Sequence, residues 1–235
     1  MEIAGYIKTS LIEWPGKISS VIFVPGCNFR CPFCHNADLV VRSKVSKFQS
    51  FKEKEVLADL EKRKKWVEAV AVTGGEPTLQ ADLSRFLSRL KQMGFLTMVE
   101  SNGTKPEIIN ELIIKKLTDY IAMDIKGDLE DYERYTNVQC TIYDIQKSIE
   151  LIVKSGVEYE FRTTVVPGLH NLENLTKLAK QVGKTPNIRW FLNQFRPMNC
   201  LDKKYLKIKP YSVEELKKIC RNLQKIIPQT NLRGV

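Results

Sequence analysis

The sequence predicts an α/β fold in which parallel strands with outer helices form a partial (β/α)6 TIM-like barrel. Six short runs rich in Val, Ile, Phe and Thr each end at a Gly or Pro, which is typical of buried strands. Amphipathic segments lie between them, and the repeat of roughly 25 to 45 residues suits βα units with right-handed crossovers. A complete TIM barrel has eight such units, so six predict an incomplete one.

The predicted strands span residues 19–26, 69–75, 95–103, 120–127, 159–168 and 189–197. Three segments are predicted as helices, at 82–94, 143–156 and 212–227. In the first, Leu83, Phe86, Leu87 and Leu90 recur at helical spacing, and Gly94 fits a C-terminal cap. The third begins with Ser212 followed by Glu215, which is a capping box. No Gly/Ser-rich linker interrupts this pattern, so residues 1–235 are expected to form one domain.

Composition excludes several classes of protein. The 235 residues are 43% hydrophobic, enough for a core that needs no disulfides, and the six cysteines are too uneven for a disulfide scaffold. No signal peptide and no membrane span is apparent, which predicts a cytoplasmic protein with reduced thiols. The net charge of +10 fits either a lysine-rich solvated surface or attraction to nucleic acid or an acidic protein. Because the basic residues are dispersed without a recognition motif, nucleic-acid binding is disfavoured.

Three of the six cysteines, Cys27, Cys31 and Cys34, follow the first predicted strand with the spacing C-x3-C-x2-C. Buried cysteines often act as small hydrophobic residues, but three in a loop beside Pro and Gly argue for ligands. Zinc would need a fourth ligand, and His35 is poorly placed for it directly after Cys34. A [4Fe–4S] cluster held by three thiolates would keep one iron open for an amine and a carboxylate of a small molecule.

The segment CNFRCPFCHN, with Phe33 just before its last cysteine, resembles the motif of the radical S-adenosylmethionine superfamily. Together with Trp14-Pro15-Gly16 upstream, it is similar to the glycyl-radical-enzyme activases, and most to the activating proteins of anaerobic ribonucleoside-triphosphate reductase. The resemblance implies a cluster on the three cysteines that cleaves S-adenosylmethionine to methionine and a 5′-deoxyadenosyl radical. It also implies that Phe33 packs near the adenine and that the backbone at His35 bonds to it.

Two further motifs end the second and third predicted strands. Both TGGEP and ESNGT are ordinary turn material. By resemblance, Gly74, Gly75 and Glu76 contact the amino group of S-adenosylmethionine, a role that suits a carboxylate. Also by resemblance, Ser101 and Asn102, with Glu100 in place of the usual Asp, face the cofactor and, in some members, a monovalent cation.

Later strand ends carry more charged residues. Asp124 and Lys126 lie two residues apart, so their side chains share one strand face. They could form only an exposed ion pair, but the activase pattern places an Asp-x-Lys near the cofactor and the glycine-bearing loop. Arg162 either reaches solvent or, as the resemblance implies, pairs with the cofactor carboxylate or ribose. Where related chains have a His after the sixth strand, this chain offers Gln194 or Asn199.

The resemblance implies as partners a glycyl radical enzyme, anaerobic ribonucleotide reductase, and reduced flavodoxin or ferredoxin as electron donor. Three alternatives remain open. The chain could activate a different glycyl radical enzyme of the pyruvate formate-lyase type. It could act on a small molecule such as a deazapurine or a tetrapyrrole precursor. It could be a non-enzymatic zinc or redox module. Cys140, Cys200 and Cys220 are too scattered for a second cluster and are expected to be structural.

Overall fold

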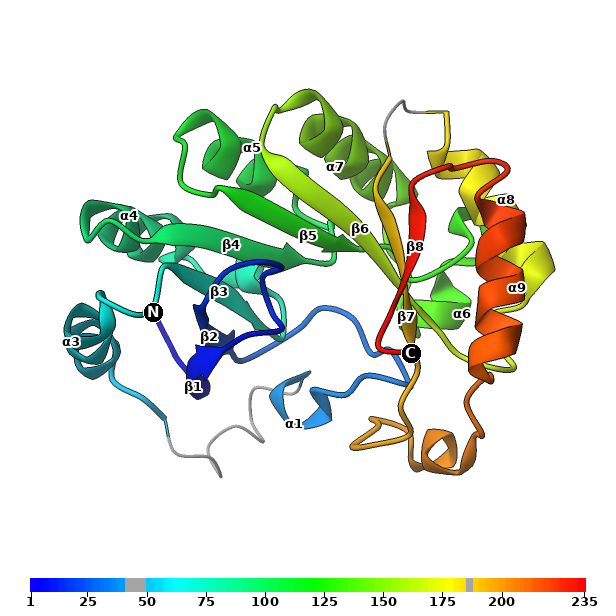
Figure 1. Ribbon diagram of the computed structural model, residues 1–235, viewed down its shortest axis with the longest axis horizontal. Coiled ribbons are helices and arrows are strands. Elements are labelled where there is room, and N and C mark those ends of the chain that lie inside the picture. Colours follow the sequence, from blue (N-terminus) through cyan, green and yellow to red (C-terminus); the bar gives the residue numbers. More distant parts are fainter. Residues whose placement is uncertain (41–49, 185–187) are drawn as a thin grey trace. The chain divides into compact units, whose positions relative to one another are not determined.

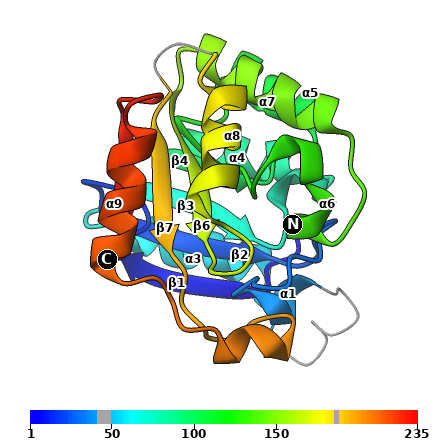
Figure 2. The same cartoon turned by 90° about the vertical axis from the view of Figure 1, so that its right-hand side faces the viewer.

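The computed structural model describes residues 1–40, 50–184 and 188–235, and Figures 1 and 2 show its ribbon. Eight strands follow one another in one sheet in chain order, β1 to β8. The six predicted strands are all present, and the α/β class is confirmed. They are β2 (Ser19–Val24), β3 (Ala69–Gly74), β4 (Leu96–Ser101), β5 (Tyr120–Asp124), β6 (Glu158–Val165) and β7 (Trp190–Gln194).

Two strands were not predicted. Strand β1 (Gly5–Ser10) pairs antiparallel with β2, and its register shifts between Ile7 and Ser10. Its central residues are exposed, so it lacks the apolar run that marks the inner strands. Strand β8 (Thr230–Arg233) is parallel to β7 and only four residues long. A run this short carries little periodicity, which explains why the sequence pattern misses it.

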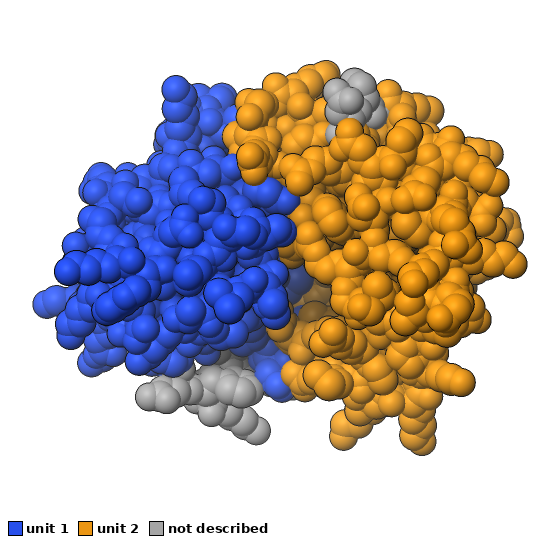
Figure 3. Space-filling model, in the orientation of Figure 1, with its two compact units in different colours: residues 1–28, 38–101, 107–122 blue, residues 29–37, 102–106, 123–235 orange. Residues whose placement is uncertain are grey.

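The chain divides into two compact units, which Figure 3 colours separately. The first unit comprises residues 1–28, 38–101 and 107–122, and the second comprises residues 29–37, 102–106 and 123–235. The prediction of one domain over residues 1–235 stays a prediction. None of the helices in the described ranges is both long and apolar enough to cross a membrane.

In the first unit, β2, β3 and β4 are parallel, and β3 alternates Ala with Val over residues 69–72. Val70 and Val72 of β3 point into a cluster with the apolar residues of helices α3 (Glu53–Arg63) and α4 (Leu83–Gln92). Ala69 and Ala71 point to the other face, where Trp14 packs on Tyr120 with ring centroids 5.4 Å apart. The Trp of the WPG motif is therefore a core residue. The unit also contains the short α1 (Ala37–Val40), η1 (Pro77–Leu79) and most of α5 (Pro106–Ile114).

The second unit packs helices against β6, β7 and β8, which are parallel. Helix α9 (Val213–Leu223) begins with the predicted capping box, in which the N–H of Glu215 donates to Ser212 Oγ at 3.2 Å. Cys220 lies on its buried face, as expected of a structural cysteine. The remaining elements are η2 (Leu129–Asp131), α6 (Glu133–Thr136), α7 (Ile142–Lys154), α8 (Leu172–Val182) and η3 (Lys203–Lys207).

Candidate functional site

The loops that follow β2 and β3 meet through their backbones. The register aligns Val24 with Gly74, so the two strands end level. Beyond them, Gly75 N–H donates to Val24 O and Glu76 N–H donates to Gly26 O, each at 2.8 Å. A Cβ on Gly75 would come within 2.1 Å of Gly26 O. The two loops can therefore meet only because Gly occupies position 75, and this contact places the backbone next to Cys27.

Glu76 is a buried carboxylate held by three hydrogen bonds. Its side chain is 1% exposed. Its Oε1 accepts from Thr78 N–H at 3.0 Å, from Thr78 Oγ1 at 2.6 Å and from Ser101 Oγ at 2.9 Å. These bonds join two of the predicted site residues, Glu76 and Ser101, across the ends of β3 and β4. They hold one carboxylate oxygen in place, which preorganises the group for a cationic partner.

The ESNGT segment is divided between the two units. In the first unit, Glu100 Oε2 accepts from Thr73 Oγ1 at 2.6 Å. In the second, Asn102 closes a turn, since its Oδ1 accepts from Thr104 N–H at 3.0 Å. The turn then requires Gly103, whose φ is +78° and whose added Cβ would meet Met123 Cε at 2.0 Å. The ESNGT motif is therefore a turn, as its sequence predicts.

The cysteine loop, residues 27–36, is divided between the units, and its part in the second unit is held by backbone hydrogen bonds. Arg30 N–H donates to Thr136 O at 2.8 Å, and Cys34 N–H donates to Cys31 O at 3.1 Å. Cys31 is buried, and none of the chain's six cysteines, all within the described ranges, forms a disulfide. Among the described residues, no three His, Cys, Asp or Glu side chains stand as a metal site. The donor set of three thiols nevertheless fits an iron–sulfur cluster chemically.

Asp124 and Lys126 form the predicted pair, with Lys126 Nζ 2.8 Å from Asp124 Oδ2. Burial alone would lower the pKa of Lys126, but Asp124 and the sulfurs of Cys31 and Cys34 raise it above its usual value. Burial raises the pKa of the Cys34 thiol, and the Lys126 cation opposes this shift. The lysine therefore supplies a positive charge to the cysteine loop, which favours thiolates there.

His170 supports Lys126, and sequence reasoning did not assign it a role. Its Nδ1 accepts from Val166 N–H at 3.1 Å, so Nε2 carries the proton and donates to Lys126 O at 2.8 Å. Burial lowers the pKa of His170 to about 4, so the ring is neutral at pH 7. Tyr132 OH accepts from the N–H of the same residue, Lys126, at 3.0 Å. No motif marks these two residues, because their role comes from packing.

Phe33 and His35 lie in defined surroundings. The ring of Phe33 is 5% exposed and packs 6.2 Å from His170 and 6.5 Å from Tyr205, between ring centroids. His35 Nε2 donates to Arg196 O at 2.6 Å. The side chain of Asn199 donates to His35 O at 2.9 Å, so this candidate for the missing His contacts the cysteine loop. These contacts orient the loop, whereas the predicted contacts of Phe33 and His35 with adenine remain predictions.

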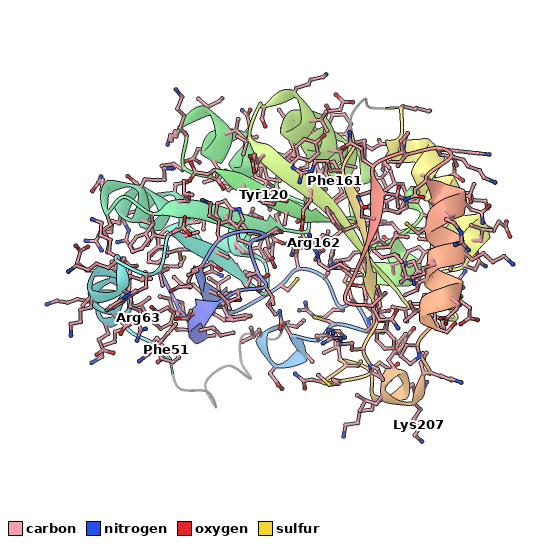
Figure 4. The ribbon with its side chains drawn as sticks, in the orientation of Figure 1. Phe51, Arg63, Tyr120, Phe161, Arg162 and Lys207 are labelled. Carbon is pink, nitrogen blue, oxygen red and sulfur yellow. The ribbon has the colours of Figure 1, made fainter. Side chains whose placement is uncertain are left out.

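Arg162 lies on β6, where Figure 4 labels it beside Phe161. Its Nε pairs with Glu160, a side chain that is 1% exposed and that also accepts from Arg233 Nη2 at 2.7 Å. Burial alone would raise the pKa of Glu160, but Arg233 and Arg162 lower it to about 2. Arg162 is thus a buried residue with a protein partner, which excludes the alternative that it merely reaches solvent. Arg233 on β8 is a neighbour that the sequence analysis missed.

Two side-chain oxygens at the end of β7 are buried and accept no hydrogen bond from the described residues. They are Asn193 Oδ1 and Gln194 Oε1. The amide nitrogen of Gln194 is engaged, since it donates to Tyr211 O at 2.9 Å. Buried acceptors are normally satisfied by protein, water or ligand, so these two oxygens can receive hydrogen bonds from a bound molecule.

Comparison with known proteins identifies the family. The sequence profile of the radical SAM superfamily matches residues 21–182. A Methanocaldococcus jannaschii protein assigned as a glycyl-radical enzyme activating enzyme is 32% identical over 99% of this chain and 96% of its own length. The pyruvate formate-lyase-activating enzyme of Clostridium pasteurianum is 28% identical over 92% of this chain and 94% of its own.

A solved structure supports the fold. It is a domain of the pyruvate-formate lyase-activating enzyme from Bacteroides vulgatus, with a TM-score of 0.58, 19% identity, and coverage of 71% of this chain and 99% of that one. The partial TIM-like class predicted from six strands is therefore confirmed. With the profile covering most of the chain and a relative aligned almost end to end, this protein belongs to the radical S-adenosylmethionine superfamily and, within it, to the glycyl-radical enzyme activating enzymes.

Proposed function

We propose that this protein uses S-adenosylmethionine and a [4Fe–4S] cluster to generate a glycyl radical on anaerobic ribonucleoside-triphosphate reductase. The observation that carries the proposal is the joined pair of loops after β2 and β3. There, the residue before Cys27 bonds through its backbone to the Gly-Gly-Glu turn. The choice of reductase as partner is supported by the likeness of the motifs WPG and CPFCHN to the activases of that enzyme.

In this proposal Cys27, Cys31 and Cys34 hold the cluster, which, when reduced, supplies the electron that breaks a carbon–sulfur bond of S-adenosylmethionine. The Lys126 cation opposes the effect of burial on the Cys34 thiol and so favours the thiolate form that binds iron. His170 and Tyr132 hold the Lys126 backbone on its two sides, so the cation stays at the loop.

The remaining site residues bind and orient the cofactor. Glu76 accepts the ammonium group of S-adenosylmethionine with its fixed carboxylate. Arg162 faces its carboxylate, and the Glu160 partner limits the motion of the guanidinium. Gly74 contributes backbone only, since an added Cβ would come within 2.5 Å of Val24 N and O. Ser101 and Asn102 also face the cofactor in this proposal. A monovalent cation would bind near these two residues.

The test is an anaerobic assay of the reconstituted holoenzyme with the purified reductase. Electron paramagnetic resonance should detect a glycyl doublet after reduction in the presence of S-adenosylmethionine. The variant Cys31→Ser should lose the cluster, cofactor cleavage and the doublet together. The matched control Cys140→Ser, at a half-buried cysteine outside the loop, should keep all three. Cofactor cleavage with no doublet on the reductase would contradict the choice of partner.

A second candidate function is activation of a pyruvate formate-lyase type of enzyme. It is favoured by the relatives that carry that name, one of which aligns over 92% of this chain. The same assay separates the two candidates when both partner enzymes are offered in parallel. A doublet on the lyase alone would select the second candidate.

A further inference from the structure

A lysine-rich turn follows the last residues of the site. We define the lysine turn as residues 203–209, which include η3 and the exposed side chains of Lys203, Lys204, Lys207 and Lys209. Over residues 196–209 the chain has five basic side chains and one acidic one, Asp202. Asp202 is used locally, since its Oδ1 accepts from Lys204 N–H at 2.9 Å. Among the described carboxylates, Glu215 interacts electrostatically with Lys209, whereas none forms an ion pair with Lys203, Lys204 or Lys207, so most of the charge of the turn is not neutralised.

The lysine turn is attached to the cysteine loop. Asp202 N–H donates to Pro32 O at 2.9 Å, and the ring of Tyr205 lies 6.5 Å from that of Phe33. Beside this attachment is a pocket of about 640 Å³. Its lining includes one acidic group, Asp202, and basic groups from three segments: Arg30 of the cysteine loop, Arg134 of α6 and Lys203 of the turn. A positive surface therefore adjoins the residues on either side of Cys31.

We propose that the lysine turn and this pocket form the docking surface for a small acidic protein that carries one electron. The inference rests on the proposed function, which requires an electron from outside the chain. On docking, the reduced carrier would be oxidised by one electron, and the [4Fe–4S] cluster that the cysteine loop would hold would be reduced by it, with no atom or proton transferred. Complementary charge at this place would both steer the carrier and bring its redox group to the loop.

The positive charge of the lysine turn would attract any acidic partner. The position of the turn beside the cysteine loop is what favours an electron carrier. The four lysines lie in one short turn rather than along a groove that could follow a nucleic-acid backbone. The backbone bond to Pro32 couples the turn to the loop that contains Cys31 and Cys34. A partner seated on the turn would therefore contact the part of the chain that must receive the electron.

The test compares charge-reversed holoenzymes in binding to an oxidised flavodoxin, measured by calorimetry without turnover. The variant Lys203→Glu/Lys204→Glu/Lys207→Glu should bind at least about tenfold more weakly at about 20 mM salt, and the difference should shrink to about threefold at about 0.5 M. The matched control is Lys147→Glu/Lys154→Glu/Lys225→Glu, on α7 and the turn after α9. Figure 4 labels Lys207 at the lower end of the second unit, whereas Figure 1 shows α7 at its upper end. The control should weaken binding less than about threefold.

Folding is checked through iron content and circular dichroism, and the Gln series at positions 203, 204 and 207 should give an intermediate loss. Equal losses in the turn variant and the control, or no loss in either, would overturn the proposal. It would also be overturned if the turn variant lost affinity for the glycyl radical partner or for nucleic acid while keeping that for flavodoxin. Dithionite reduces the enzyme without a docked protein. Wild type that fails to cleave S-adenosylmethionine with dithionite refutes the proposed function, whereas intact cleavage with no docking effect refutes only this inference.

Discussion

Replacing Glu160 with Gln should lower the free energy of unfolding by about 3 kcal/mol at pH 7. The carboxylate is 1% exposed and is paired with both Arg162 and Arg233. Its removal leaves two guanidinium groups facing a neutral amide, one of them with a side chain only 10% exposed. Breaking a buried ion pair from one side is costly because the remaining charge keeps its desolvation penalty.

The magnitude follows from the pKa of Glu160, which is about 2 in the folded chain. Against an ordinary value of about 4.3, the difference is worth about 3 kcal/mol at 1.36 kcal/mol per unit. Because the folded pKa is the lower one, this stabilisation is complete above about pH 5 and is lost as the pH falls toward 2. At about pH 3.5 the contribution should have fallen to about 2 kcal/mol.

Urea unfolding of wild type and Glu160→Gln, followed by circular dichroism at several pH values, measures this difference. The matched control is Glu173→Gln. That side chain is 78% exposed, and its ion pair with Lys177 Nζ, at 3.6 Å, lies at the surface. The control should change stability by less than about 0.5 kcal/mol. A loss below about 1 kcal/mol for Glu160→Gln, or a loss that does not decrease in acid, would refute the assigned ion-pair network.

Three further predictions concern the site. Gly75→Ala should lower the free energy of unfolding in urea by more than about 2 kcal/mol and reduce iron incorporation. The control Gly156→Ala, at a position with a positive φ but open space around it, should cost about 1 kcal/mol. Similar costs for the two variants would contradict the close contact between Gly75 and Gly26. Because the folded pKa of His170 is lowered to about 4, wild type should lose about 2 kcal/mol between pH 7 and 5. In His170→Gln this loss should disappear, and an unchanged pH dependence would contradict it. Asp124→Asn should slow cleavage of S-adenosylmethionine by about 10- to 100-fold with normal iron content, and wild-type rates would exclude the ion pair from the site.

Much of the fold could be predicted because its signals are local. The six inner strands carry continuous apolar runs, and α4 and α9 carry helical periodicity with recognisable caps. Helix α8 has a capping box made of Asn171 and Asn174, which the Ser/Thr and Glu pattern does not detect. Strands β1 and β8 were missed for a different reason. An exposed edge strand and a four-residue strand gain their stability from pairing with a neighbour, and pairing leaves no mark in the local sequence.

The candidate site divides in a similar way. The sequence by itself determined which residues are predicted to carry the chemistry, because C-x3-C-x2-C, Gly-Gly-Glu and Asp-x-Lys are each contained within eight residues. Only the tertiary structure decided what supports them. The neutral ring of His170 beneath Lys126, the contact of Asn199 with His35 and the pairing of Arg233 with Glu160 join segments 44, 164 and 73 residues apart. Such contacts depend on packing and burial, and these physical quantities exist only once the chain has folded.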